Sequence, residues 1–298
     1  MRRIIAMKKY VLAITLGIVA LGLSSCRRDA TTPAEVKEEL RARTVVFTVA
    51  GRSYEVKSTD GGFDGGDIIG IIAPDLGYIN VKGKVDGRAL LPEVPIRWEA
   101  GQTRFSEFFA YFPYDEGLNS TTSKMSIPSD QSTEEAFLAA DLRTAHVNAE
   151  PLTTVDFVLG HRFSRINFVL SSKVGGEAAE KVVLKDLLTE ATVDLSTGGT
   201  ALSGSKADIS ALKQGDNRFA AIVLPQPYME VIVTTNKGRD IKYTTYTPVT
   251  LEGGCAYEAR LVIPETGHNP SEIGFTLSII DWENGGTVSY GEPKEEGL

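Results

Sequence analysis

Short runs in which apolar and polar residues alternate fill most of this 298-residue chain, and turn-forming residues separate them. Near the N-terminus, Val45, Phe47 and Val49 alternate with other residues before a turn at residues 50–53. A second clean run, which ends at a hairpin turn over residues 281–286, has apolar residues at Ile273, Phe275, Leu277 and Ile279. Because successive side chains of a strand point to opposite faces, this alternation predicts half-buried strands. Turn signals about every ten residues predict an all-β sandwich.

Residues 132–147 have a different period. Ser132 or Thr133 can cap a helix, acidic residues fill its first turn, and apolar residues follow at helical spacing. This pattern predicts a short helical segment, packed on the edge of the sandwich. Residues 148–151 end the helical pattern and mark a candidate boundary, which divides the chain into an N-terminal domain (44–150) and a C-terminal domain (151–298).

The alternation changes parity soon after this boundary. The first run has apolar residues at Val155, Phe157 and Leu159, and the second has them at Ile166, Phe168 and Leu170. The buried face therefore shifts by one residue between the two runs. A β-bulge near residues 160–161 would produce such a shift.

The first 26 residues read as an export signal. Lys8 and Lys9 precede an apolar run over residues 10–23, which is short for a membrane span. Leu23, two serines and Cys26 follow in the order of a lipobox, so we expect Cys26 to be lipidated and to become the mature N-terminus. The simpler alternative is an ordinary signal peptide with a cysteine at this place by chance.

Residues 27–43 read as a tether or propeptide. They mix both charges with few large apolar side chains, so they cannot bury enough surface to offset chain entropy. Arg41 and Arg43 lie just ahead of the first strand pattern and offer sites to a trypsin-like protease. A basic pair in a solvated linker explains the two arginines equally well.

Composition narrows the possible partners. The net charge is −8 and no basic stripe occurs, which argues against nucleic acid. Only two cysteines are present, so lipidation of Cys26 would leave Cys255 without a disulfide partner, as a small buried apolar residue. Beyond the N-terminal run, no stretch is long and apolar enough to predict another membrane span.

The sequence contains no convincing catalytic or metal-binding pattern. Its three histidines, His146, His161 and His268, are not at ligand spacings, and His161 is more simply a hydrogen-bonded structural residue than a base. The acidic loop at residues 60–67 fails the spacing of a calcium loop. We therefore expect no enzyme activity, no metal and no cofactor.

Aromatic side chains leave a second interpretation open. Exposed rings could stack on sugars, and the candidates are Trp98, Trp282, Tyr243 and Tyr246. Core packing is the simpler expectation for both tryptophans.

Several motifs in order resemble the fimbrillin family of Bacteroidetes lipoproteins, the type V pilins and their accessory subunits. The lipobox at Cys26 comes first, and the remaining matches lie at residues 111–114 (YFPY), 139–142 (AADL), 155–166 (VDFVLGHRFSRI), 223–226 (VLPQ), 253–257 (GGCAY) and 279–282 (IIDW). The resemblance covers nearly the whole chain. It implies two tandem transthyretin-like β-sandwich domains, with the helical segment near their junction.

The resemblance also implies a route of assembly. A lipidated precursor reaches the outer membrane, an arginine-specific protease cuts at Arg41 or Arg43, and a strand from another subunit fills the resulting groove. The residues expected to form the exchanged strands are Ile273, Phe275, Leu277, Ile279, Val288 and Tyr290. An added strand would satisfy both the unpaired backbone groups and the apolar slot of an incomplete sheet.

The expected function is therefore that of a structural, non-enzymatic subunit of a cell-surface fimbria. Its partners would be other fimbrial subunits and, through lipid, the outer membrane; a host protein or glycan remains open as a further partner. The alternative is a glycan-binding or otherwise adhesive lipoprotein that stays anchored and does not polymerise. A single exposed aromatic platform would favour that alternative, and a removable N-terminal strand would favour the fimbrial subunit.

Overall fold

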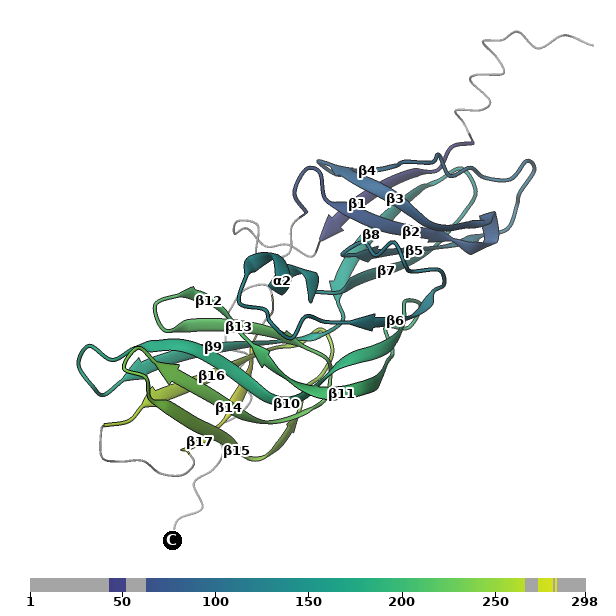
Figure 1. The fold of residues 1–298 in the computed structure, drawn as a ribbon. Helices are drawn as coiled ribbons and strands as arrows, with labels where there is room; N and C mark the ends of the chain where they lie inside the picture. The colour runs from purple at the N-terminus through teal and green to yellow at the C-terminus, as the bar shows by residue number, and fades with distance from the viewer. Residues whose placement is uncertain (1–42, 52–62, 266–272, 281, 283–298) are drawn as a thin grey trace, which may run out of the picture. The chain divides into compact units, whose positions relative to one another are not determined.

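The computed structural model describes residues 43–51, 63–265, 273–280 and 282, and nearly all their regular structure is β-strand (Figure 1). The chain divides into two compact units, Met1–Leu40 and Arg41–Leu298, and every described residue belongs to the second. The prediction of an all-β protein is confirmed. None of the helices in this described part is long and apolar enough to cross a membrane.

The N-terminal strands close into a barrel in the order β1-β4-β3-β2-β5-β7-β8. Their bounds are β1 (Val46–Gly51), β2 (Ile68–Ala73), β3 (Tyr78–Asp86), β4 (Ala89–Pro92), β5 (Ser106–Phe112), β7 (Arg143–Ala149) and β8 (Thr154–His161), with the 3₁₀ turn η1 (Pro74–Leu76) between β2 and β3. We expected two facing sheets here. The alternation could not separate the two arrangements, because a barrel and a sandwich both bury every second side chain.

Aromatic rings fill the barrel. The ring of Phe47 on β1 stacks on Phe157 of β8, with 5.7 Å between centroids, and meets Phe108 of β5 edge-on. Trp98 also packs edge-on against Phe108, with 5.3 Å between centroids. Rings of this size contribute most of the apolar area in a small core. β1 is therefore packed into the barrel by its side chains as well as paired by its backbone.

The C-terminal strands form two sheets, in the orders β11-β10-β14-β15-β17 and β12-β13-β9-β16-β18. Their bounds are β9 (Ser164–Ser172), β10 (Ala179–Asp194), β11 (Thr200–Ser210), β12 (Leu212–Gly215), β13 (Arg218–Val223), β14 (Pro227–Thr235), β15 (Asp240–Thr250), β16 (Ala256–Ile263), β17 (Ile273–Phe275) and β18 (Leu277–Ile280). Buried residues of both sheets, such as Phe168, Phe219 and Tyr243, belong to one core cluster. Two sheets that share a core form a β-sandwich.

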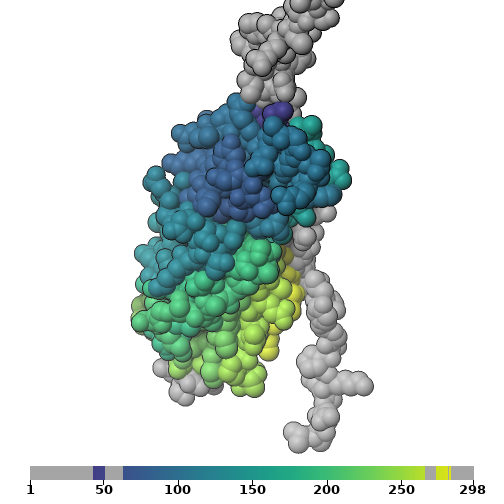
Figure 2. All heavy atoms as spheres, turned by 90° about the vertical axis from the view of Figure 1, so that its right-hand side faces the viewer, coloured from purple at the N-terminus to yellow at the C-terminus, as the bar shows by residue number. Residues whose placement is uncertain are grey.

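Two elements join the barrel to the sandwich. β6 (Thr122–Ser126) comes from the N-terminal half of the chain but pairs with β10, with Met125 opposite Ala191. The helix α2 (Glu134–Ala139) follows, and its N-cap Thr133 accepts a hydrogen bond from the Ala136 N–H. In Figure 2, the teal residues of this region lie directly against the green residues of the sandwich.

The predicted helix begins where we expected but ends early. Residues 143–149 form β7 instead, and β7 pairs along the whole of β5, from Ser106 opposite Ala149 to Phe112 opposite Arg143. A full ladder of backbone hydrogen bonds outweighs the local helical pattern of these residues. The helical segment near the junction is confirmed for Glu134–Ala139 only.

The predicted bulge near residues 160–161 is wrong. β8 ends at His161 as a strand of the barrel, and β9 begins at Ser164 as a strand of the sandwich. The parity of the alternation changes because the chain leaves one sheet and enters another. Since β8 follows residue 150 and pairs with β1 and β7, the barrel extends by backbone pairing to His161.

Candidate functional site

β1 is the strand that closes the barrel. It pairs in parallel with β8 at six positions, from Val46 opposite Thr154 to Gly51 opposite Leu159, but with β4 at only two. The Thr48 hydroxyl also donates a hydrogen bond to Asp156 on β8. Among the described strands, β4 and β8 meet only through β1. Removal of β1 would therefore leave two open sheet edges and an apolar slot.

Only one of the predicted processing sites can be placed. Arg43 lies in a turn just before β1, half-buried, and its carbonyl accepts a hydrogen bond of 2.8 Å from the Trp98 N–H. The next residues remain on the barrel, since the Val45 N–H donates to the Ile96 carbonyl at 2.9 Å. A protease needs locally open chain, so these bonds must break before cleavage after Arg43. Cys26 and Arg41 lie outside the described residues.

The predicted C-terminal strand is two strands, so that prediction needs correction. Ile273 and Phe275 belong to β17, which pairs in parallel with β15 in one sheet, whereas Leu277 and Ile279 belong to β18, which pairs with β16 in the other. The buried face changes at the crossing: Phe275 is 5% exposed, Ile279 is 38% exposed and Ile280 is 5% exposed. The chain passes from the edge of one sheet to the edge of the other, which alternation alone could not reveal. Val288 and Tyr290 lie outside the described residues.

We call β17, β18 and Trp282 the C-terminal segment. It has only seven ladder positions, three on β15 and four on β16. Side-chain contacts also hold the segment. The Phe275 ring lies edge-on to Tyr228, with 6.3 Å between centroids. The Tyr246 ring lies close over Gly274: a Cβ at residue 274 would be 2.4 Å from the Cζ of Tyr246. The segment is therefore seated in the sandwich by few backbone bonds and a few well-placed rings.

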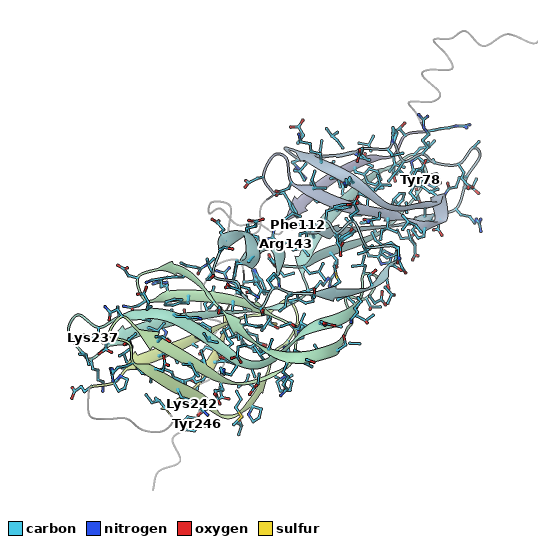
Figure 3. All side chains as sticks on the ribbon, in the orientation of Figure 1. Tyr78, Phe112, Arg143, Lys237, Lys242 and Tyr246 are labelled. Atoms are coloured by element: carbon cyan, nitrogen blue, oxygen red, sulfur yellow. The ribbon has the colours of Figure 1, made fainter. Side chains whose placement is uncertain are left out.

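A buried group of three charged or titratable side chains, which we call the charge cluster, lies where β7 begins and β8 ends. It consists of Asp141, Arg143 and His161. The Arg143 Nε and Nη2 donate to one oxygen of Asp141 at 2.8 and 2.7 Å, and the Nδ1–H of His161 donates to the other oxygen at 2.6 Å. The Arg143 guanidinium also lies over the Phe63 and Phe112 rings; Phe112 and Arg143 are labelled together in Figure 3.

The electrostatics of the charge cluster favour the ionised form of Asp141. Burial by itself would raise the pKa of Asp141, but the Arg143 guanidinium and the His161 ring outweigh burial and hold the pKa below its usual value of 3.8. A buried ion pair of this kind is tolerated because every partner is present, and removal of one partner strands the others. The charge cluster thus fixes the position of the His161 ring.

The other face of that ring contacts the C-terminal segment. The Trp282 indole stacks on His161 with 4.1 Å between ring centroids and 23° between planes. A hollow of about 540 Å³ beside the stack is lined from both sides, by Thr144, His146 and Val158 of the barrel and by Cys255, Ile280 and Trp282. His161 therefore joins a barrel strand to the C-terminal segment.

Among the described residues, the histidines and the acidic loop show no catalytic arrangement. His161 is hydrogen-bonded and structural, as predicted, while His146 stacks on Phe109 at 4.4 Å and His268 lies outside the described residues. In the acidic loop, the Asp64 N–H donates to Asp67 and closes a turn. Within the residues that the structure describes, no three His, Cys, Asp or Glu side chains are grouped to hold a metal ion.

The aromatic candidates for sugar stacking are dispersed. Trp98 is buried in the barrel and Tyr243 is buried in the sandwich, where its hydroxyl donates to the Val262 carbonyl at 3.1 Å. Tyr246 is 82% exposed on β15, beyond Lys242 in Figure 3, and Trp282 is half-buried on His161. These four rings do not form one platform. The expectation of core packing is confirmed for Trp98.

The charge cluster was the feature that sequence reasoning missed. Asp141 and Arg143 fall within residues 132–147, which the sequence pattern assigns to the helical segment, and His161 lies outside that pattern. Asp141 and Arg143 could have been identified as a pair from their spacing of two residues. In an extended chain, this spacing places both side chains on the same face.

By fold, the chain is an all-β protein in which a barrel is followed by a two-sheet sandwich. The model of the fimbrillin-like family matches residues 56–282, which is more than half of the chain. The chain therefore belongs to the fimbrillin-like family.

Solved structures show the same fold. A candidate cell adhesion protein from Bacteroides uniformis superposes with a TM-score of 0.63 at 20% identity, over 81% of this chain and 99% of that one. A candidate cell adhesion protein from Bacteroides ovatus gives a TM-score of 0.60 at 18% identity, over 80% and 98%. At such identities the likeness concerns the fold alone. No curated protein matches the sequence.

Proposed function

We propose that this fimbrillin-like protein is a structural subunit of a cell-surface fimbria, exported as a lipoprotein and joined to neighbouring subunits by β-strand exchange. Family membership supports the fimbrial role. The observation that carries the mechanism is the position of β1, because it alone connects β4 to β8 in the described barrel.

The acceptor in this proposal is the site that β1 leaves. Val45, Phe47 and Val49 are all buried, so their departure uncovers an apolar slot between the edges of β4 and β8. An extended segment with alternating apolar residues would pair with both edges and refill the slot. Strand addition of this kind satisfies backbone groups and apolar surface together.

Arginine cleavage would prepare the acceptor. A cut at Arg41 or Arg43 frees the chain from its lipid at Cys26 but leaves β1 on the barrel. Arg52 comes directly after the last residue of β1 in the sequence, so a cut there would separate β1 from the remaining chain. We include Arg52 with Arg41 and Arg43 as candidate processing sites.

The donor would come from the C-terminal residues of another subunit. Its apolar contacts would be Ile273, Phe275, Leu277, Ile279, Val288 and Tyr290. β17 and β18 have only three and four ladder positions in their own sheets, so few backbone bonds are given up when they leave.

The proposal assigns a role to each part of the chain. Residues 1–26 are the lipoprotein signal, with Cys26 as the lipid anchor in the outer membrane, and residues 27–43 are the tether. The predicted domains at 44–150 and 151–298 would be two tandem transthyretin-like domains, with the division moved to residues 162–163 because β8 belongs to the barrel. No metal or cofactor takes part, and other fimbrial subunits are the partners.

Limited digestion tests the proposal. Residues 27–298 are treated with an arginine-specific protease, and the products are followed by intact mass and on an unboiled SDS gel. We expect a cut at Arg52, with or without cuts at Arg41 and Arg43, and then a ladder of SDS-resistant oligomers. A variant with all three arginines changed to lysine is the control and should stay monomeric. A stable monomer after cleavage at Arg52 would contradict strand exchange and favour the anchored adhesive lipoprotein.

A further inference from the structure

The strand that carries His161 depends on β1 for most of its pairing. β7 is opposite β8 only at Gly160 and His161, whereas β1 is opposite residues 154–159. Within the described residues, β1 is therefore the sole ladder partner of that stretch of β8. The stack of Phe47 on Phe157 joins the same two strands on the inside of the barrel.

At its C-terminal end, β8 presents the His161 ring to Trp282. The ring is held in place by Asp141, and its face is covered by the indole at 4.1 Å. Stacked aromatic pairs contribute about 0.5–1.5 kcal/mol beyond the area that they bury. Because β18 has only four ladder positions, a contribution of this size is large for the C-terminal segment.

From this chain of contacts we propose that Trp282 on His161 is a latch that holds the C-terminal segment on its own subunit, and that β1 keeps the latch closed by supporting β8. Loss of β1 then has two effects in one step: it opens the acceptor slot and it loosens the subunit's own donor. The docking site is the face of His161 with the adjoining hollow, and its occupant is Trp282 of the same chain.

The latch would prevent early assembly. While β1 is in place, the slot is filled and the C-terminal segment is seated, so neither half of a subunit contact is exposed. This inference rests on the proposed function for its biological meaning. The latch itself is a property of the single chain and can be measured on the monomer.

Hydrogen–deuterium exchange of residues 277–280 reports directly on the latch. In the uncleaved chain of residues 27–298, we expect Trp282→Ala to speed exchange of these amides about 3- to 10-fold, which corresponds to loss of one aromatic stack. Trp282→Phe keeps a ring on His161 and should restore most of the protection. Both variants leave the charge cluster intact, so folding is preserved.

The matched control uses the two histidines that line the same hollow. His161→Ala should speed exchange of residues 277–280. His146→Ala, which removes a ring stacked on Phe109 of β5, should not. The double variant His161→Ala/Trp282→Ala should exchange no faster than His161→Ala alone, because the first substitution already removes the contact with Trp282. Unchanged exchange in Trp282→Ala, or equal effects of the two histidine variants, would overturn the latch.

A second pair of variants tests whether β1 affects the latch. Phe47→Ala weakens the seating of β1 on β8, and Ile69→Ala removes a buried side chain from β2 on another wall of the barrel. Compared at equal global stability, Phe47→Ala should speed exchange of residues 277–280 and Ile69→Ala should not. Equal rates in the two variants would overturn the coupling.

The outcomes separate this inference from the proposed function. Suppose that oligomers form after arginine cleavage but Trp282→Ala leaves hydrogen–deuterium exchange unchanged. That result would reject the latch and retain strand exchange. Faster exchange in Trp282→Ala, in a chain that stays monomeric after cleavage, would support the latch and reject the fimbrial mechanism.

Discussion

At the scale of single residues, Asp141 is the side chain on which the junction depends. It accepts hydrogen bonds from both Arg143 and His161, and all three side chains are almost fully buried. A buried charge without its partner is far more costly than a broken ion pair at the surface. The position of Trp282 therefore depends indirectly on a carboxylate that it does not touch.

We expect Asp141→Asn to destabilise the protein by about 3 kcal/mol, because the Arg143 guanidinium would remain buried without a counter-charge. Urea unfolding at neutral pH measures the change. Asp208→Asn is the control, since Asp208 pairs with Lys185 on an exposed surface and its loss should cost less than about 1 kcal/mol. Equal losses in the two variants would contradict the role given to the charge cluster.

The same variant has an expected pH dependence. The pKa of Asp141 in the folded protein lies below its usual value of 3.8, so its contribution is fully present above the unfolded-state pKa. That contribution is lost as the pH falls through the lower folded-state pKa. The stability difference between the wild type and Asp141→Asn should therefore be constant near neutral pH and shrink in strong acid. A difference that is independent of pH would rule out the ionised form of Asp141.

At the scale of elements, close approach of strands decides details that alternation cannot. Gly70 on β2 is opposite Tyr111 on β5, whose buried ring occupies the space where a side chain would lie. The Tyr111 hydroxyl is fixed in turn by hydrogen bonds to Asn80 and to the carbonyl of Asp115. The ring therefore has little freedom to move.

Gly70→Ala should destabilise the barrel by about 1–3 kcal/mol, because the new Cβ would lie 2.0 Å from Tyr111 Cε1 and force the ring away. Thermal unfolding followed by circular dichroism measures this loss. Gly65→Ala serves as the control, as nothing lies within 4 Å of its Cβ position. A neutral Gly70→Ala would show that the ring moves aside freely.

The elements also show how far the sequence predicts the fold. Strands with one buried face and the start of α2 at Thr133 follow from local pattern and capping. Local pattern does not predict three other features: the end of α2, the passage from β8 to β9, and the division between β17 and β18. Each of these depends on which strand, distant in the sequence, pairs with the segment. Local period describes a strand's faces but not the sheet that it joins.

The candidate site was predictable to a similar extent. Alternation identifies Phe275 and Leu277 as strand residues, and the role of β1 as the closing strand appeared only with its pairing to β8. The charge cluster could not be predicted as a unit, because Asp141 and His161 are twenty residues apart and meet only through the barrel.

At the scale of the whole molecule, the two ends of the folded unit are connected. β1 supports β8, β8 positions His161, and His161 holds Trp282 of the C-terminal segment. A subunit built in this way would remain a monomer until its N-terminal strand is removed. Under the proposed strand exchange, a C-terminal segment from another copy would then take the place of β1.

A peptide-binding measurement tests that claim most directly. A labelled peptide of residues 273–290 is mixed with the chain before and after arginine cleavage has removed β1, and binding is followed by fluorescence anisotropy. We predict stable binding to the cleaved chain only, and loss of binding when aspartate replaces Phe275 and Leu277 in the peptide. Equal binding to both forms of the chain, or none to the cleaved form, would contradict strand exchange.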